Sequence, residues 1–167
     1  MLRSVIAAAA ACAFALLPWH GVSAQTGTAL SSDEGLQAVE AGRRYALAHQ
    51  LRLSFVVVDA GGHVVVALRM DGAAFATMTF SQGKAFASVA AGGLSGAQLI
   101  ARYRDEPWIW GNATVSADGG PMLPGAGTFP VRRGGMLIGA IAVSGAGPAE
   151  DDAAARAALD AIPAAGL

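Results

Sequence analysis

The chain has 167 residues, of which 54% are hydrophobic and 14% are charged, and its formal net charge is −1. This length suits one domain, and so low a share of charge argues against a disordered tail protein or an electrostatic nucleic-acid binder. We therefore expect no nucleic-acid partner.

The first residues have the three parts of a secretory signal peptide. A short cationic start, Met1–Arg3, precedes an unbroken apolar run, Val5–Leu17, and small residues follow at Val22–Ala24. The apolar run is too short to span a bilayer. We expect residues 1–24 to be removed and residues 25–167 to be exported to the periplasm or outside the cell, with no membrane insertion. A buried N-terminal helix is the alternative.

Cysteine chemistry is excluded from the exported form. The chain's one cysteine, Cys12, lies inside the predicted signal peptide. Cysteine nucleophiles, thiolate haem ligation, iron–sulfur clusters and cysteine-based zinc sites therefore cannot occur in the folded protein. Residues 25–31 are small and polar, which predicts a flexible mature N-terminus.

An amphipathic helix and a hairpin come first in the predicted domain. Ser31 and Glu34 have the spacing of a capping box, and the apolar stripe that follows predicts a helix over residues 32–49. Two β-branched runs, 53–59 and 63–69, flank a glycine pair. Two strand-forming runs with a glycine turn between them predict a β-hairpin.

Two helices and a long loop follow. Residues 75–91 are rich in alanine, phenylalanine and methionine and predict a helix that ends near a second glycine pair. Ser95 caps a shorter predicted helix over 95–104. Residues 105–128 contain many glycines and prolines, which predicts a long loop with a short strand at 113–116.

The last predicted elements are a second hairpin, with strands at 128–131 and 136–143, and a closing helix over 149–162. Acidic residues open this helix, where they suit the helix dipole. Strands in antiparallel pairs, with helices between the pairs, predict an α+β fold: one antiparallel sheet of two hairpins with helices packed against it.

The exit from the last strand is a candidate anion site. Ser144, Gly145 and Gly147 lie between that strand and the closing helix, where backbone amides can bind a phosphate or carboxylate. The segment is neither a P-loop nor a dinucleotide fingerprint. The acidic start of the helix opposes an anion, and a plain turn is the alternative.

Histidine and tryptophan supply the other candidates. Only His49 and His63 remain in residues 25–167, and they lack a two-histidine metal spacing. His63 opens a strand after a tight turn and is the best nitrogen donor for a metal or haem. Trp108 and Trp110 could form one wall of a pocket for a planar ligand, because alternate residues of an extended segment face the same way. Structural roles are the alternative for all four.

Five blocks of the sequence have a specific order and spacing: Val56–His63, Arg69–Ala73, Lys84–Ala85, Ile138–Gly145 and Glu150–Asp152. Together they resemble the GlcG/HbpS-like haem-binding family, which includes haem-degrading domains. The resemblance extends over residues 33–163. It implies a sheet covered by helices, a profilin-like α/β sandwich that we expect to occupy residues 32–165. It also implies homo-oligomers and, in characterised relatives, the binding or slow degradation of haem.

The resemblance also implies roles for individual residues. Lys84 and the turn 144–147 occupy matched blocks and would contact an anionic group such as a haem propionate. Arg69 is a further candidate cation. His63 matches a turn position that need not be histidine in relatives, and it is our candidate for the iron donor as the best nitrogen donor in the chain. The leading hypothesis is an exported haem- or tetrapyrrole-binding protein that stores, senses or slowly degrades haem. Segment 105–128 departs most from the family's pattern, so we expect ligand specificity to vary there.

Two other functions remain open. One is an accessory protein or enzyme acting on a small organic acid, with Lys84 or Arg69 holding the carboxylate. The other is an oligomeric module that binds a protein partner without a cofactor. No hydrolase or nucleotide motif is present and no catalytic residue is identified, so the sequence does not decide whether the chain is an enzyme.

Overall fold

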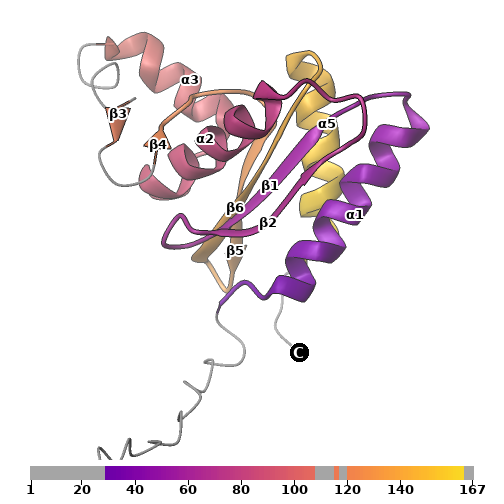
Figure 1. The fold of residues 1–167 in the computed structure, drawn as a ribbon. Helices are drawn as coiled ribbons and strands as arrows, with labels where there is room; N and C mark the ends of the chain where they lie inside the picture. The colour runs from indigo at the N-terminus through magenta and orange to yellow at the C-terminus, as the bar shows by residue number, and fades with distance from the viewer. Residues whose placement is uncertain (1–28, 108–114, 117–119, 164–167) are drawn as a thin grey trace, which may run out of the picture.

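The structure, a computed structural model, describes residues 29–107, 115–116 and 120–163. Its centre is a four-stranded antiparallel sheet in the order β2-β1-β6-β5 (Figure 1). The strands are β1 (Ser54–Asp59), β2 (Val64–Arg69), β5 (Thr128–Arg133) and β6 (Met136–Ser144). The helices within the described residues are α1 (Ser32–Ala48), α2 (Ala76–Ala90), α3 (Gly96–Asp105) and α5 (Pro148–Leu159).

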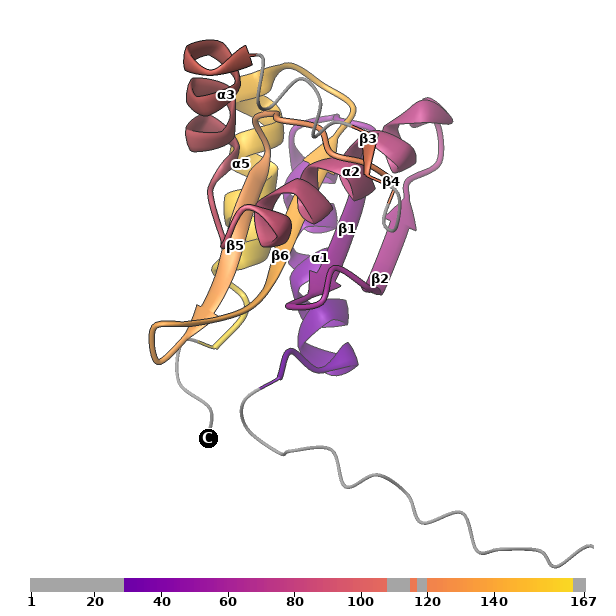
Figure 2. The ribbon, with the colours of Figure 1, turned by 90° about the vertical axis from the view of Figure 1, so that its left-hand side faces the viewer.

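The elements form three layers. Helices α1 and α5 cover one face of the sheet, and α2 covers the other, with α3 following on the same side (Figures 1 and 2). The predicted α+β fold with one sheet of two hairpins is confirmed, and the hairpins join through β1 and β6. In the described ranges, no helix combines the length and the apolar character that crossing a bilayer requires.

The long predicted loop contains a second, two-stranded sheet. Strand β3 (Val115–Ser116) pairs antiparallel with β4 (Gly120–Pro121). The strand expected at 113–116 is therefore present over its last two residues, and its partner strand was not predicted. Residues 108–114 and 117–119 lie outside the described part of the chain.

Local side-chain signals fix the start of α1. Ser31 Oγ accepts the Glu34 amide at 3.2 Å, and Glu34 Oε2 accepts the Ser31 amide at 2.9 Å, which is the predicted capping box. Helix α3 has the same arrangement between Ser95 and Gln98. These helix starts depend on residues three positions apart, so a single sequence is enough to locate them.

Strand β1 is buried on both faces and separates two apolar clusters. Phe55 and Val57 belong to the cluster beneath α1 and α5, whereas Val56 and Val58 belong to the cluster beneath α2. The α2 side is filled largely by small side chains, those of Ala85, Ala140 and Ala142. Small residues let a helix lie close to a sheet, so α2 is held near the polar groups at the end of β6.

Gly42 of α1 allows that helix to approach β1. A Cβ atom at this position would lie 2.5 Å from Phe55 Cε1 and 3.1 Å from Ala158 Cβ. Overpacking a core costs about 1–3 kcal/mol, whereas alanine gains about 1 kcal/mol over glycine in helix propensity. The 2.5 Å approach to the fully buried Phe55 ring puts this site at the upper end of that cost, about 2–3 kcal/mol. We therefore expect Gly42→Ala to lower the free energy of unfolding in urea by about 1–2 kcal/mol. Gln37→Ala, at an exposed position of the same helix, should change it by less than about 0.5 kcal/mol. A Gly42→Ala protein as stable as the parent would contradict this packing.

Candidate functional site

Four of the predicted site residues gather near the end of β6: Lys84, Ser144, Gly145 and Gly147. Arg69 ends β2 at the same end of the sheet, because Ser54 of β1 pairs in register with both Arg69 and Ser144. His63 lies at the opposite end of the β1–β2 hairpin. The structure thus separates the predicted iron donor from the predicted anion contacts.

The side chain of Lys84 is the polar centre of this group. Its ammonium donates to the carbonyl oxygens of Ala126 at 2.7 Å and Val143 at 2.8 Å, and to Asp151 Oδ2 at 3.2 Å. Only 13% of the side chain is exposed. An ammonium has three protons to donate, so these contacts use all of them. To hold a ligand carboxylate, Lys84 would have to give up one of the three.

Asp151 completes the pair from the first turn of α5. Burial raises the pKa of Asp151, and the Lys84 charge and the Ala146 amide only partly offset this effect. Its Oδ1 accepts the Ala146 amide at 3.1 Å, and the neighbouring Asp152 carboxylate accepts the amide of Gly127. Two backbone amides near the glycine-rich turn therefore bind carboxylates of α5.

Buried hydroxyls line the adjoining surface between α2 and the sheet. Ser54 Oγ lies 2.8 Å from Thr77 Oγ1, and Ser81 Oγ donates to the Ser54 carbonyl at 3.0 Å. Ser144 is also buried, and its Oγ has no hydrogen-bond partner among the described residues. Across all the residues that the structure describes, no group of three or more histidine, cysteine, aspartate or glutamate side chains is placed to hold a metal ion.

His63 lies on the surface beside an aspartate. Its side chain is 84% exposed, and its Nδ1 is 3.4 Å from Asp59 Oδ1. The same Asp59 oxygen accepts the amides of Gly61 at 2.8 Å and His63 at 2.9 Å, so the hairpin turn holds this carboxylate in place. With Nδ1 beside this carboxylate, Nε2 is the ring nitrogen that faces away from Asp59 and is available to bind a metal.

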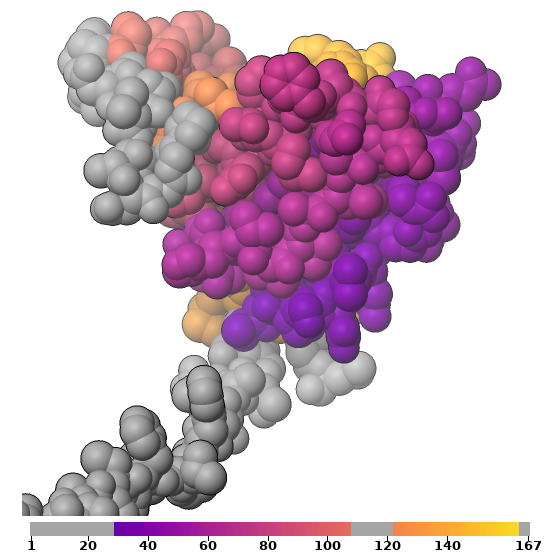
Figure 3. All heavy atoms as spheres, in the orientation of Figure 1, coloured from indigo at the N-terminus to yellow at the C-terminus, as the bar shows by residue number. Residues whose placement is uncertain are grey.

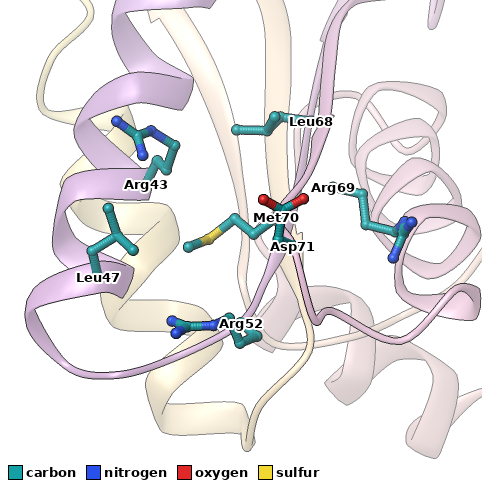
Figure 4. Close-up of a pocket in the computed structure, with 7 residues that line it drawn as sticks. All are labelled: Arg43, Leu47, Arg52, Leu68, Arg69, Met70 and Asp71. Atoms are coloured by element: carbon teal, nitrogen blue, oxygen red, sulfur yellow. The ribbon is translucent and has the colours of Figure 1, made fainter.

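A separate cavity of about 310 Å³ opens between α1 and the end of β2. Figure 4 shows its lining residues, which are Arg43, Leu47, Arg52, Leu68, Arg69, Met70 and Asp71. The Arg69 side chain extends to the other side of β2 from Leu68 and Met70 (Figure 4), and its Nη1 donates to the Ala73 carbonyl at 2.6 Å. The positive charges that face the cavity are therefore those of Arg43 and Arg52, and not that of Arg69.

Sequence reasoning missed three of these residues. It treated Asp151 as a helix-dipole residue and as part of a family block, without its contact to Lys84. It gave Arg43 and Arg52 no role, because the cavity that they line also needs residues 68–71 from another segment. The Asp59 turn had a readable signal, since aspartate before a glycine pair is typical of a side chain that binds its own turn. Trp108 and Trp110 lie outside the described residues, so their predicted role stays a prediction.

Comparison with known proteins connects this fold to one family. Residues 30–160 match the family described as haem degrading protein HbpS-like. No curated protein matches the sequence.

Three solved structures share the fold. A double mutant of HbpS from Streptomyces reticuli is 25% identical, with a TM-score of 0.72 and coverage of 96% of this chain and 99% of that one. A complex of PduOC with haem is 26% identical, with a TM-score of 0.70 and coverage of 80% and 95%. The protein ORFY of Klebsiella pneumoniae, at 23% identity, a TM-score of 0.71 and coverage of 84% and 94%, supports the fold alone.

The pair between Lys84 and Asp151 yields a stability prediction. Lys84→Met leaves the buried Asp151 carboxylate without a counter-charge, so we expect the free energy of unfolding to fall by about 3–5 kcal/mol at neutral pH. The loss should be smaller at about pH 4, because a protonated Asp151 has no charge to compensate. Urea denaturation at both pH values measures the difference.

The control for this experiment is the double variant Lys84→Met/Asp151→Leu. It removes both charges and should recover part of the stability lost in Lys84→Met. A loss below about 1 kcal/mol in the single variant, or a loss independent of pH, would contradict the assigned role of the pair.

Proposed function

Since the chain belongs to the HbpS-like family of haem-degrading proteins, we propose that it is an exported haem-binding protein. The observation that carries the proposal is the family match over residues 30–160. A structural relative, PduOC, is seen in complex with haem. The proposed roles are the storage, sensing or slow degradation of haem, and the predicted signal peptide over residues 1–24 supports export.

The donor set at His63 suits a haem iron. Histidines that bind metals usually donate their other ring N–H to a carboxylate or carbonyl, which orients the ring and raises its basicity. Asp59 is placed for this role, 3.4 Å from His63 Nδ1 and fixed by two backbone amides. Bound haem would supply its iron chemistry, while His63 and Asp59 would hold and orient it.

Val64, which follows His63 in the chain, is 44% exposed and is placed to contact the apolar part of the ring. Phe75 and Phe80, 87% and 49% exposed, lie toward the Arg69 end of β2 and away from His63. Strand β2 and the start of α2, to which these three residues belong, lie on one open face of the molecule (Figure 3). Proteins bury most of the surface of a bound ligand, yet His63 is largely exposed in one chain. We therefore propose that a second copy covers this face and that the protein binds haem as a homo-oligomer.

The distance between Arg69 and His63 is also consistent with a haem site shared by two subunits. Arg69 follows His63 by six residues along β2, a span of roughly 20 Å at the usual strand rise. This span is longer than the distance between a haem iron and its own propionates. Arg69 would therefore hold the propionate of a haem bound by His63 only from a neighbouring subunit.

Haemin titration of residues 25–167 tests the proposal. We expect a saturable Soret band at about one haem per chain or per interface in the parent protein. His63→Ala should weaken it strongly, and Asp59→Asn should reduce affinity about 10–100-fold, because the ring loses its orienting carboxylate. His49→Ala is the matched control, since that imidazole bonds to and stacks on Tyr45 of its own helix.

Two outcomes would count against the proposal. Absence of a saturable band in the parent would refute haem binding and favour a partner-binding module without a cofactor. Equal binding by the parent and His63→Ala, with the same Soret position, would refute His63 as the iron donor.

A further inference from the structure

We propose that the cavity between α1 and the end of β2 binds a small monocarboxylate, with the carboxylate on Arg52. The cavity is distinct from the haem site proposed above. It lies on the α1 side of the sheet and at the opposite end of β2 from His63. The proposal goes beyond haem binding and does not depend on it.

Arg52 is the cation available to a ligand. Arg43 already forms two bonds to Glu40, from Nε at 2.7 Å and from Nη2 at 2.9 Å. Arg52 donates to the Leu51 carbonyl at 3.1 Å and forms no ion pair with any described residue. A guanidinium has five N–H donors in a fork that matches a carboxylate, so Arg52 retains donors for a bidentate contact.

The cavity wall selects an anion with an apolar body. Leu47 of α1 and Leu68 and Met70 at the end of β2 face the space beside Arg52 (Figure 4). A volume of about 310 Å³ lies at the small end of the range for ligand pockets. A short aliphatic chain would bury its carbons against these three side chains while its carboxylate reaches the guanidinium.

Asp71 opposes the binding of an anion in this cavity. It is one of the lining residues, and its negative charge repels any anion that enters. A doubly charged phosphate would feel both this repulsion and the attraction to Arg52 about twice as strongly as a monocarboxylate, so these two charges do not select between the two anions. The apolar wall stabilises only a ligand with an apolar body, and it therefore favours a carboxylic acid over phosphate.

A carboxylate could come from two sources, a free organic acid or a propionate of bound haem. We test both with the processed protein recovered after export, using butanoate and haemin as probes. Butanoate binding is followed by the shifts of backbone amide signals in two-dimensional NMR, and haemin binding is followed by the Soret band. The variants are Arg52→Gln, Asp71→Asn and, as the matched control, Arg104→Gln, an exposed arginine of α3 paired with Asp105.

For a free acid, we expect saturable butanoate binding in the parent, with the largest shifts around residues 47, 52 and 70. Arg52→Gln should weaken it about tenfold or more, because it removes a charge-assisted pair of hydrogen bonds. Asp71→Asn should tighten it about two- to fivefold by removing the repulsion. Arg104→Gln should bind like the parent, and thermal unfolding should show Arg52→Gln to be folded.

The haemin arm separates the two sources. If Arg52→Gln weakens haemin binding while butanoate does not bind, the cavity holds a haem propionate, and the proposal of a separate site for a free monocarboxylate is overturned. If folded Arg52→Gln binds both probes as the parent does, or if neither probe binds to the parent, the proposal is overturned. Loss of haemin binding in His63→Ala with butanoate binding intact would show that the two sites are separate.

Discussion

The ammonium of Lys84 joins four parts of the fold in one place. It lies on α2 and binds a carbonyl before β5, a carbonyl at the end of β6 and a carboxylate of α5. Helices α2 and α5 cover opposite faces of the sheet, so this contact passes around the end of the sheet and ties the two outer layers together. A buried charge with all its donors satisfied tolerates little displacement, which holds the glycine-rich turn in one conformation.

The position of α2, fixed by the Lys84 contacts, leaves two different surfaces on the two sides of β2. Helix α2 is held over β1 and β6, so the outer strand β2 remains uncovered on that side, where exposed apolar residues and His63 lie. On the other side of β2, the end of α1 leaves the cavity of Arg52 and Met70. One edge strand therefore contributes to both proposed sites. Strand β5 at the opposite edge contains Pro130 and two arginines, which discourage pairing with another chain.

Local patterns in the sequence predict most of the fold but little of the site. Capping boxes, glycine turns and β-branched runs act over a few residues, so the helices and hairpins of the main sheet are readable from the chain alone. Lys84 and Asp151 are 67 residues apart, and no local pattern indicates that they meet. The cavity combines Arg43, Arg52 and Met70 from three segments, and only the packed fold brings them together. The resemblance to the family locates Lys84 in a functional block, but it does not show that the three N–H donors of the ammonium already bind Ala126, Val143 and Asp151.

A crystal structure of the haemin-loaded protein would test the central claim of this account most directly. The account predicts iron bound to Nε2 of His63, with Asp59 beside Nδ1, at a face covered by a second chain. It also predicts that Lys84 still contacts Ala126, Val143 and Asp151. Iron bound to another residue would contradict the proposed haem site, and Lys84 turned away from Asp151 toward a propionate would contradict the structural role of the lysine.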